Sequence, residues 1–237
     1  SSIGLLVTSR DFASSSNRVL SLNTRLKLNP NWVLSGQVMR SFTRQLDGTG
    51  VSGPAYSVGL DRSGRHFYYY GGYLDRSPGF RSQLGFIPRV DIRQMEHFAR
   101  YHWIPERRRL VSYGPSVYTL VNWDRQGRVQ DWVVSPAFGV ELTGQTAIYV
   151  NRSEAYELFQ DHGFRKHNTG ISFSTAWLKW LTISSSYNQG SNVNFFPASG
   201  LMPFLAQSRN ARLEFTLRPV PRLRFDQTYL FSRLSAR

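Results

Sequence analysis

The chain contains 237 residues, of which 41% are hydrophobic and 14% aromatic, so it can bury enough apolar surface to fold. It has no cysteine, which excludes disulfide frameworks, thiolate metal sites and cysteine nucleophiles. Its 29 lysines and arginines exceed its 15 acidic residues, and the net charge of +14 favours a polyanionic partner such as nucleic acid or an anionic membrane surface.

Apolar and polar residues alternate along nearly the whole chain. The first clear runs cover residues 20–28, 32–38 and 56–60; later ones cover 111–121, 132–140, 171–177, 181–187, 213–217 and 223–231. Because successive side chains of a strand point to opposite faces, each run predicts a strand with one apolar and one polar face. Only residues 154–160 suggest a helix.

Short turns containing Pro, Gly or Asn separate the predicted strands and alternate with longer polar connections. The longer connections are expected at residues 10–16, 44–53, 75–88, 153–164 and 191–206. Turn signals recur roughly every 15–24 residues, more widely than in soluble sandwiches. Strands of about 9–14 residues are long enough to cross a bilayer. The sequence therefore predicts an all-β, antiparallel up-and-down transmembrane β-barrel, with about thirteen strands visible in one domain over residues 1–237.

The two faces of such strands demand different surroundings. A barrel of about thirteen strands has an interior too wide for side chains to fill, so the apolar face is expected to contact lipid and the polar face to line a wet lumen. The charged residues assigned to the lumen are Arg25, Lys27, Arg212, Glu214, Arg224 and Asp226. The residues assigned to the lipid face are Leu22, Val58, Val117, Phe173, Phe215 and Phe225.

Aromatic residues are expected to form two girdles, one at each membrane interface. One group lies beside the short turns and comprises Trp32, Trp177 and Trp180. The other is expected beside the loops at the opposite ends of the strands and comprises Tyr56, Trp123, Trp132 and Tyr187.

Two stretches carry a resemblance to a known family. One is the run from Ile3 to Arg10; the other is Leu84-Gly-Phe-Ile-Pro-Arg-Val-Asp91. They resemble the C-terminal barrel of a bacterial family, domain of unknown function 5916, whose members carry an N-terminal domain similar to carbohydrate-binding family 9. The resemblance implies an outer-membrane barrel associated with glycan binding, and implies that this chain is a fragment of a longer one.

The leading hypothesis is a bacterial outer-membrane barrel domain that acts as a pore or a membrane anchor, with membrane lipid as its partner and anionic solutes or glycans as possible cargo. A soluble basic protein that binds single-stranded nucleic acid is the first alternative. A surface hydrolase with a loop-borne active site is the second. Because no nucleophile–base constellation is present, we expect no catalytic residue. No histidine forms a close ligand pair, and the GxGxxG match at residues 48–53 is followed by Pro54 and a predicted strand rather than a helix, so we expect no metal site and no cofactor. Nucleic acid is not the favoured partner.

Overall fold

The computed structural model describes every residue except 86, 88, 106 and 237. The described residues form no helix, and thirteen β-strands account for most of them. The strands are β1 (Ser2–Phe12), β2 (Ser15–Lys27), β3 (Trp32–Arg44), β4 (Gly50–Ser63), β5 (Phe67–Arg76), β6 (Ile92–Tyr101), β7 (Leu110–Trp123), β8 (Val129–Leu142), β9 (Thr146–Phe159), β10 (His162–Leu178), β11 (Leu181–Asn194), β12 (Phe204–Val220) and β13 (Leu223–Ser235).

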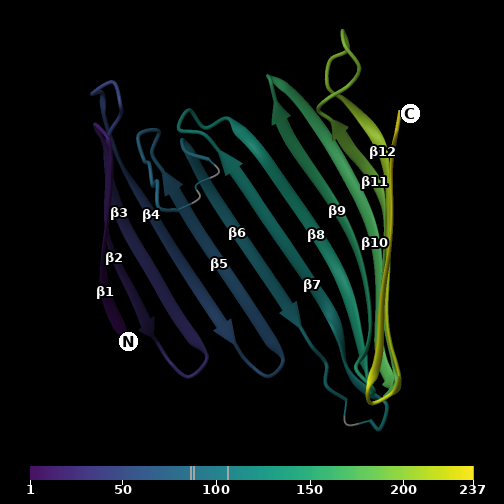
Figure 1. The fold of residues 1–237 in the computed structure, drawn as a ribbon. Helices are drawn as coiled ribbons and strands as arrows, with labels where there is room; N and C mark the ends of the chain where they lie inside the picture. Colours follow the sequence, from purple (N-terminus) through teal and green to yellow (C-terminus); the bar gives the residue numbers. More distant parts are fainter. Residues whose placement is uncertain (86, 88, 106, 237) are drawn as a thin grey trace. The chain divides into compact units, whose positions relative to one another are not determined.

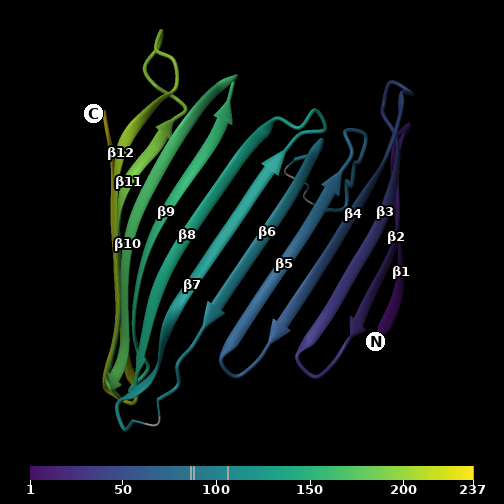
Figure 2. The same ribbon diagram turned by 180° about the vertical axis from the view of Figure 1, so that it is seen from behind.

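The strands follow one another across a single sheet in chain order, without a crossover (Figure 1). The register is antiparallel wherever it is described, from β1 through β5 and from β9 through β13. The predicted antiparallel meander is therefore confirmed. Among the described residues β1 pairs only with β2 and β13 only with β12, so the sheet is open at both edges. The same strand order is seen from behind in Figure 2.

The chain divides into two compact units. Unit 1 comprises Ser1–Phe98 and Leu120–Asp131, and unit 2 comprises Ala99–Thr119 and Trp132–Arg237. Unit 1 therefore contains β1–β5, most of β6 and the tight connection between β7 and β8. Unit 2 contains β9–β13 and most of β7 and β8.

Two of the expected long connections are tight turns instead. Residues 13–14 alone join β1 to β2, and residues 160–161 alone join β9 to β10. Ala13, Gln160 and Asp161 all have positive φ, the backbone conformation that two-residue hairpin turns require. The expectation of long loops at 10–16 and 153–164 was therefore wrong, because the polar residues there continue the paired strands.

The helix expected at residues 154–160 is also absent. Residues up to Phe159 belong to β9, and Glu157 pairs with Phe164 across the hairpin. Lys166 donates to Glu157, so the charged side chains of this segment are matched between strands. Cross-strand pairing outweighs the local helix preference, which contributes only fractions of a kcal/mol per residue.

Burial in this fold is inverted relative to a globular domain. The buried apolar residues among those described are few and mostly small: Val19, Ala55, Phe80, Ile92, Val193 and Ala206. Buried polar residues are at least as numerous and include Asn17, Ser21 and Ser41. Large apolar side chains are instead exposed on most of the strands. The hydrophobic core that would stabilise a soluble sheet is therefore small in both units.

Candidate functional site

In unit 1 the strand register separates an apolar face from a polar one. Leu22 and Val58 lie on the same face, as the pairing of β2 with β3 and of β3 with β4 shows. Arg25 and Lys27 lie on the other face, because each is an odd number of residues from Leu22 along β2. Leu22 is 52% exposed, so the apolar face of this unit has no protein layer over it.

The polar face of unit 1 is internally hydrogen-bonded. Gln37 donates to Ser21 at 2.7 Å, and Asn17 donates to Thr43 at 2.8 Å. The Asn17 side chain is almost completely buried, with 1% of the residue exposed. Buried amides and hydroxyls with partners of this kind are stable, whereas the same groups without partners would be costly.

Unit 2 shows the same separation on β12 and β13. One face carries four of the charged residues expected in the lumen: Arg212, Glu214, Arg224 and Asp226. Arg212 pairs with Glu214, and Arg224 pairs with Asp226 at 2.7 Å. Each arginine is thus neutralised by an acid on its own strand, which leaves little net charge on this part of the polar face.

The aromatic residues expected on the lipid side lie on the other face of unit 2. Phe215 is adjacent to Glu214 in β12 and therefore points the opposite way, and Phe225 is a residue away from Asp226 in β13. Phe173 lies on the same face through its pairing with Ser185 and the next strand. Phe225 is 51% exposed, Phe173 and Val117 are exposed, and Phe215 is half-buried, so none of them lies in a core.

The first aromatic group lies at the tight-turn ends of the strands, as the sequence predicts. Trp32 is the first residue of β3, Trp177 is the penultimate residue of β10, and Trp180 lies in the turn that follows. Trp32 contacts Tyr69 with ring centroids 6.3 Å apart, and the Arg62 guanidinium lies 5.9 Å from its ring. Trp177 and Trp180 are exposed.

The second aromatic group is spread more widely along the strands. Trp123 ends β7 and Trp132 lies near the start of β8, so both flank one turn in sequence. Tyr56 and Tyr187 lie near the middle of β4 and β11 rather than at their ends. Tyr187 nevertheless lies where its face of β11 changes from apolar to polar residues, because the next residue on that face toward the β11–β12 loop is Gln189.

The loop between β5 and β6, residues 77–91, packs onto the polar face of unit 1. Phe80 is 2% exposed and forms a small core with Val19 and Ala55. Both residues lie on the polar-face side of β2 and β4. The described residues of this loop therefore cover part of the surface that was expected to line the lumen.

Hydrogen bonds hold the loop in this position. The Arg81 backbone N–H donates to Ser41 Oγ at 2.9 Å, and the Gln83 backbone N–H donates to Asn17 Oδ1 at 3.0 Å. Asn17 also donates to the Arg81 carbonyl at 3.2 Å. Two side chains of the sheet thereby satisfy three backbone groups of the loop, as buried backbone groups require.

Two glycines permit the close approach of this loop to β4. A Cβ on Gly53 would lie 2.5 Å from the Phe80 nitrogen, and a Cβ on Gly79 would overlap the Ser52 carbonyl. Both obstacles are backbone atoms, which cannot rotate away. The missing side chains at these two positions are therefore what allows the loop and the strand to touch.

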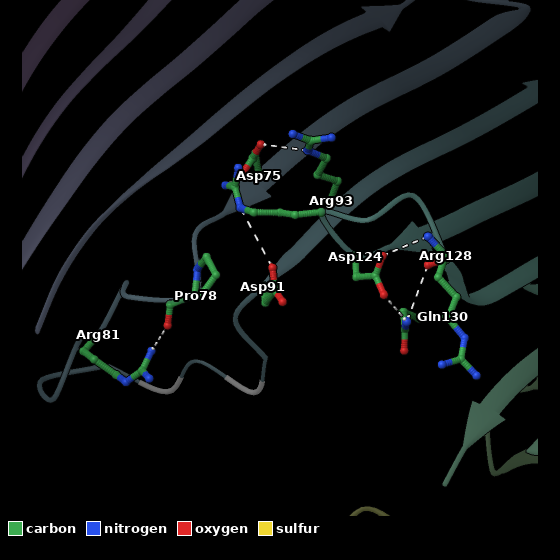
Figure 3. Close-up of polar contacts among 9 residues, drawn as sticks. Asp75, Pro78, Arg81, Asp91, Arg93, Asp124, Arg128 and Gln130 are labelled. Carbon is green, nitrogen blue, oxygen red and sulfur yellow. Dashed lines mark hydrogen bonds and ion pairs between the residues drawn. The ribbon is translucent and has the colours of Figure 1, made fainter. Parts of the chain in front are cut away.

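An ion-pair cluster joins both ends of the loop to the β7–β8 turn (Figure 3). Asp75, next to last in β5, accepts from Arg93 at 3.2 Å and from Arg125. Arg125 Nε also lies 3.9 Å from Asp91 Oδ1. Arg89 pairs with Asp131 in the same unit. Several charges share partners here, an arrangement that stabilises more than isolated surface pairs do.

The cluster contains unsatisfied groups as well. Asp91 Oδ1 and Arg125 Nε are buried, and neither has a hydrogen-bond partner among the described residues. Asp91 also has a φ of 55°, a left-handed conformation that aspartate tolerates better than most residues. These features lie at the point where the loop rejoins β6.

A cavity of about 990 Å³ lies between the loop and the hairpin ends of unit 1. Arg10 lines it and donates to Gln83 at 2.6 Å. Arg81 also lines it and donates to carbonyls of its own loop at 2.7 and 2.8 Å. Neither guanidinium forms an ion pair with a described residue, so the positive charges of the cavity are held by neutral groups.

The remaining charged residues of the cavity lining do not cancel the positive charge of Arg10 and Arg81. Arg89 is already neutralised by Asp131, and Asp47 is the acidic residue of the lining. The Thr49 backbone N–H donates to Asp47 at 2.9 Å, and hydrogen bonding from Thr49 lowers the pKa of the Asp47 carboxyl below its usual value. The described lining of the cavity therefore carries a net positive charge.

Sequence analysis did not identify the residues that hold the loop. Asn17 and Ser41 are ordinary polar residues in alternating strands, and nothing local distinguishes them from exposed ones. Phe80 carries one available signal, because it is a large aromatic residue directly after a Pro-Gly pair, in a connection that also contains Phe86. Burial of an aromatic side chain removes a large apolar area from water, so such a residue can anchor a loop.

No helix among the described residues is long and apolar enough to cross a membrane. The described part of the chain also contains no group of three or more His, Asp or Glu side chains placed to hold a metal ion. Comparison with protein-family models, with curated proteins and with solved structures finds no match for this chain.

Proposed function

We propose that this chain forms part of the wall of a β-barrel in the bacterial outer membrane. In this proposal the apolar face contacts lipid and the polar face borders an aqueous interior. The inverted burial supports it most directly: Leu22 and Phe225 are exposed, whereas Asn17 and Ser41 are buried and hydrogen-bonded. A sheet in water would lose free energy with this distribution, and a sheet in lipid would gain it.

Strand length agrees with this proposal. Most strands have 13 or 14 residues, and β10 and β12 each have 17. About 9–11 residues suffice to cross a bilayer when a strand is tilted. The strands can therefore cross the membrane and still extend beyond it at the polar ends.

The proposed domain acts as a pore or as an anchor for a glycan-binding module. The position of the docked loop helps to distinguish these two roles. Residues 77–91 cover part of the polar face, so a passage along it would be narrowed on the side of unit 1. The paired acids neutralise Arg212 and Arg224. Any preference for anionic solutes then depends on other groups, such as Arg25, Lys27 and the arginines of the cavity.

A matched pair of variants tests the membrane assignment. Phe173 and Ser172 are adjacent in β10 and point to opposite faces. In refolding into phosphatidylcholine vesicles, F173R should lower the free energy of unfolding by about 2–4 kcal/mol, the cost of a lipid-facing arginine near mid-bilayer. S172R should cost much less because its side chain reaches water.

Equal losses from the two variants would contradict the assignment of faces. Failure of the wild-type chain to enter vesicles would contradict the membrane proposal itself. Binding of a single-stranded oligonucleotide that improves in F173R would favour the soluble, nucleic-acid-binding alternative, since added arginine strengthens contacts to phosphates.

A further inference from the structure

Two arginines of unit 2 lie directly opposite each other on neighbouring strands. Arg209 of β12 and Arg233 of β13 are paired in register, and both are exposed. Neither forms an ion pair with a described residue. Like charges in this position repel each other and destabilise the strand pair. A bound anion would convert the repulsion into attraction.

The same cross-strand row carries further donors. Gln189 pairs with Arg209, and Thr169 pairs with both Gln189 and Arg152. All five positions therefore lie on one face of the sheet. Arg152 donates to Thr169 at 2.9 Å and to Glu154, so it is held in place and partly neutralised. The unbalanced charge of the row belongs to Arg209 and Arg233.

This row lies between apolar and polar parts of the face in unit 2. The next row toward the β11–β12 loop is polar and consists of Glu154, His167, Ser191, Gln207 and Ser235. One row closer to the tight turns, the residues are Val150, Ile171, Tyr187, Ala211 and Phe231. On β9, β12 and β13 an arginine therefore lies between the apolar row and this second polar row, on the side of the β11–β12 loop. Arginine at such a boundary extends its charge to the head groups while its stem stays among apolar groups.

A shallow cavity accompanies the row. It has a volume of about 300 Å³ and is lined by Arg152, Thr169, Gln189 and Arg209, together with Ile171 and Tyr187. Guanidinium and amide donors thus meet apolar and aromatic groups in one hollow. The combination suits a ligand with an anionic end and a hydrocarbon end.

We infer that Arg209 and Arg233, assisted by Gln189 and Arg152, bind the phosphate of an anionic lipid head group. The inference rests on the proposed membrane function, because the apolar row beside the arginines is then covered by acyl chains. Guanidinium groups bind phosphate oxygens through paired hydrogen bonds, and two arginines can share one phosphate. The lipid thereby removes the repulsion between the two strands.

The test uses a labelled lipid and a double variant. The full chain is refolded into phosphatidylcholine vesicles, and dansyl-labelled lipid A with its two phosphates is titrated in, with energy transfer from tryptophan as the signal. R209Q/R233Q should weaken binding about thirtyfold, since each arginine near an anionic surface contributes about 1 kcal/mol. R222Q, at the opposite tight turn between β12 and β13, is the matched control and should bind as the wild type does.

Lipid A without phosphates should bind the wild-type chain as weakly as lipid A binds the double variant. Equal binding of lipid A by wild type and double variant would overturn the inference, as would equal binding of the phosphorylated and dephosphorylated lipids by the wild type. Insertion of the wild-type chain into phosphatidylcholine vesicles is judged by circular dichroism and protease protection. If the chain does not insert, both the proposed membrane function and the lipid site are wrong. If it inserts but shows no preference for phosphorylated lipid A, only the lipid site is wrong.

Discussion

Arg125 and Asp75 form an ion pair across 50 positions of the chain, between the β7–β8 turn and the end of β5. Asp75 accepts from Arg93 as well, so one carboxylate joins the strands on both sides of the loop at residues 77–91. The ends of the loop are thereby fixed, independently of the contacts that its middle makes with the polar face.

This ion pair predicts a measurable coupling. R125Q and D75N should each lower the free energy of unfolding of unit 1 by about 1–3 kcal/mol, because R125Q removes one of the two cations that contact Asp75, and D75N removes the carboxylate that Arg93 and Arg125 share. The double variant should lose less than the sum, with a coupling of about 1 kcal/mol in urea unfolding. Additive losses would show that the pair contributes nothing beyond solvation of its members.

The contact of Phe80 with the polar face predicts the behaviour of the loop. F80A should release the loop from Val19 and Ala55, since removal of a buried phenyl ring costs about 3–5 kcal/mol. Hydrogen exchange of the Arg81 and Gln83 amides, both bonded to the sheet, should accelerate. If the polar face lines a pore, single-channel conductance should rise.

The control for this variant is Phe196, which lies in the β11–β12 connection and is 92% exposed. F196A should change neither the exchange of those two amides nor the conductance. Unchanged exchange in F80A would mean that the hydrogen bonds alone hold the loop.

The close approach at Gly79 predicts a second way to displace the loop. G79A places a Cβ against the Ser52 carbonyl, so the loop must move although no polar contact has been removed. Limited proteolysis should cut the variant within residues 77–91 faster than the wild type. G50A adds the same methyl group where no atom lies within 4 Å, and its cleavage should match the wild type. Equal cleavage of G79A and wild type would contradict the docked position.

The pairing of Arg212 with Glu214 predicts opposite effects of the two single substitutions on ion selectivity. R212Q leaves Glu214 without its cation and should lower anion preference in planar-bilayer reversal potentials. E214Q leaves Arg212 without its acid and should raise anion preference. R212Q/E214Q removes both charges and should match the wild type, and a large fall in the double variant would show that Arg212 acts on passing ions despite its partner.

The alternation of apolar and polar residues was enough to predict most of the strands and their order, although the last part of β9 was expected to form a helix. Leu22 and Arg25 were assigned to opposite faces on parity alone, and the register agrees with that assignment. The lengths of the connections were harder to predict. Residues 10–16 and 153–164 are polar because the strands there extend past the apolar band. In the sequence, a polar segment without alternating apolar residues resembles a loop. Whether such a segment forms a strand depends on pairing with the neighbouring strand, which local sequence does not reveal.

The docked loop could not be predicted for a related reason. Gln83 bonds to Asn17, 66 residues earlier in the chain, and Arg81 bonds to Ser41, 40 residues earlier. No spacing rule links residues at such separations. Phe80 is a signal for an anchored loop, but it does not indicate the surface that the loop contacts.

The chain-order pairing of the strands has a kinetic consequence. Each strand of unit 1 up to β5 can find its neighbour by closing a hairpin, which requires little loss of chain entropy and proceeds quickly. Docking of residues 77–91 reaches back to β2, and it can begin only after β2, β3 and β4 have aligned to present Asn17, Ser41 and Gly53 together. The polar face of this unit is therefore uncovered while β2, β3 and β4 assemble, and the loop covers it only afterwards.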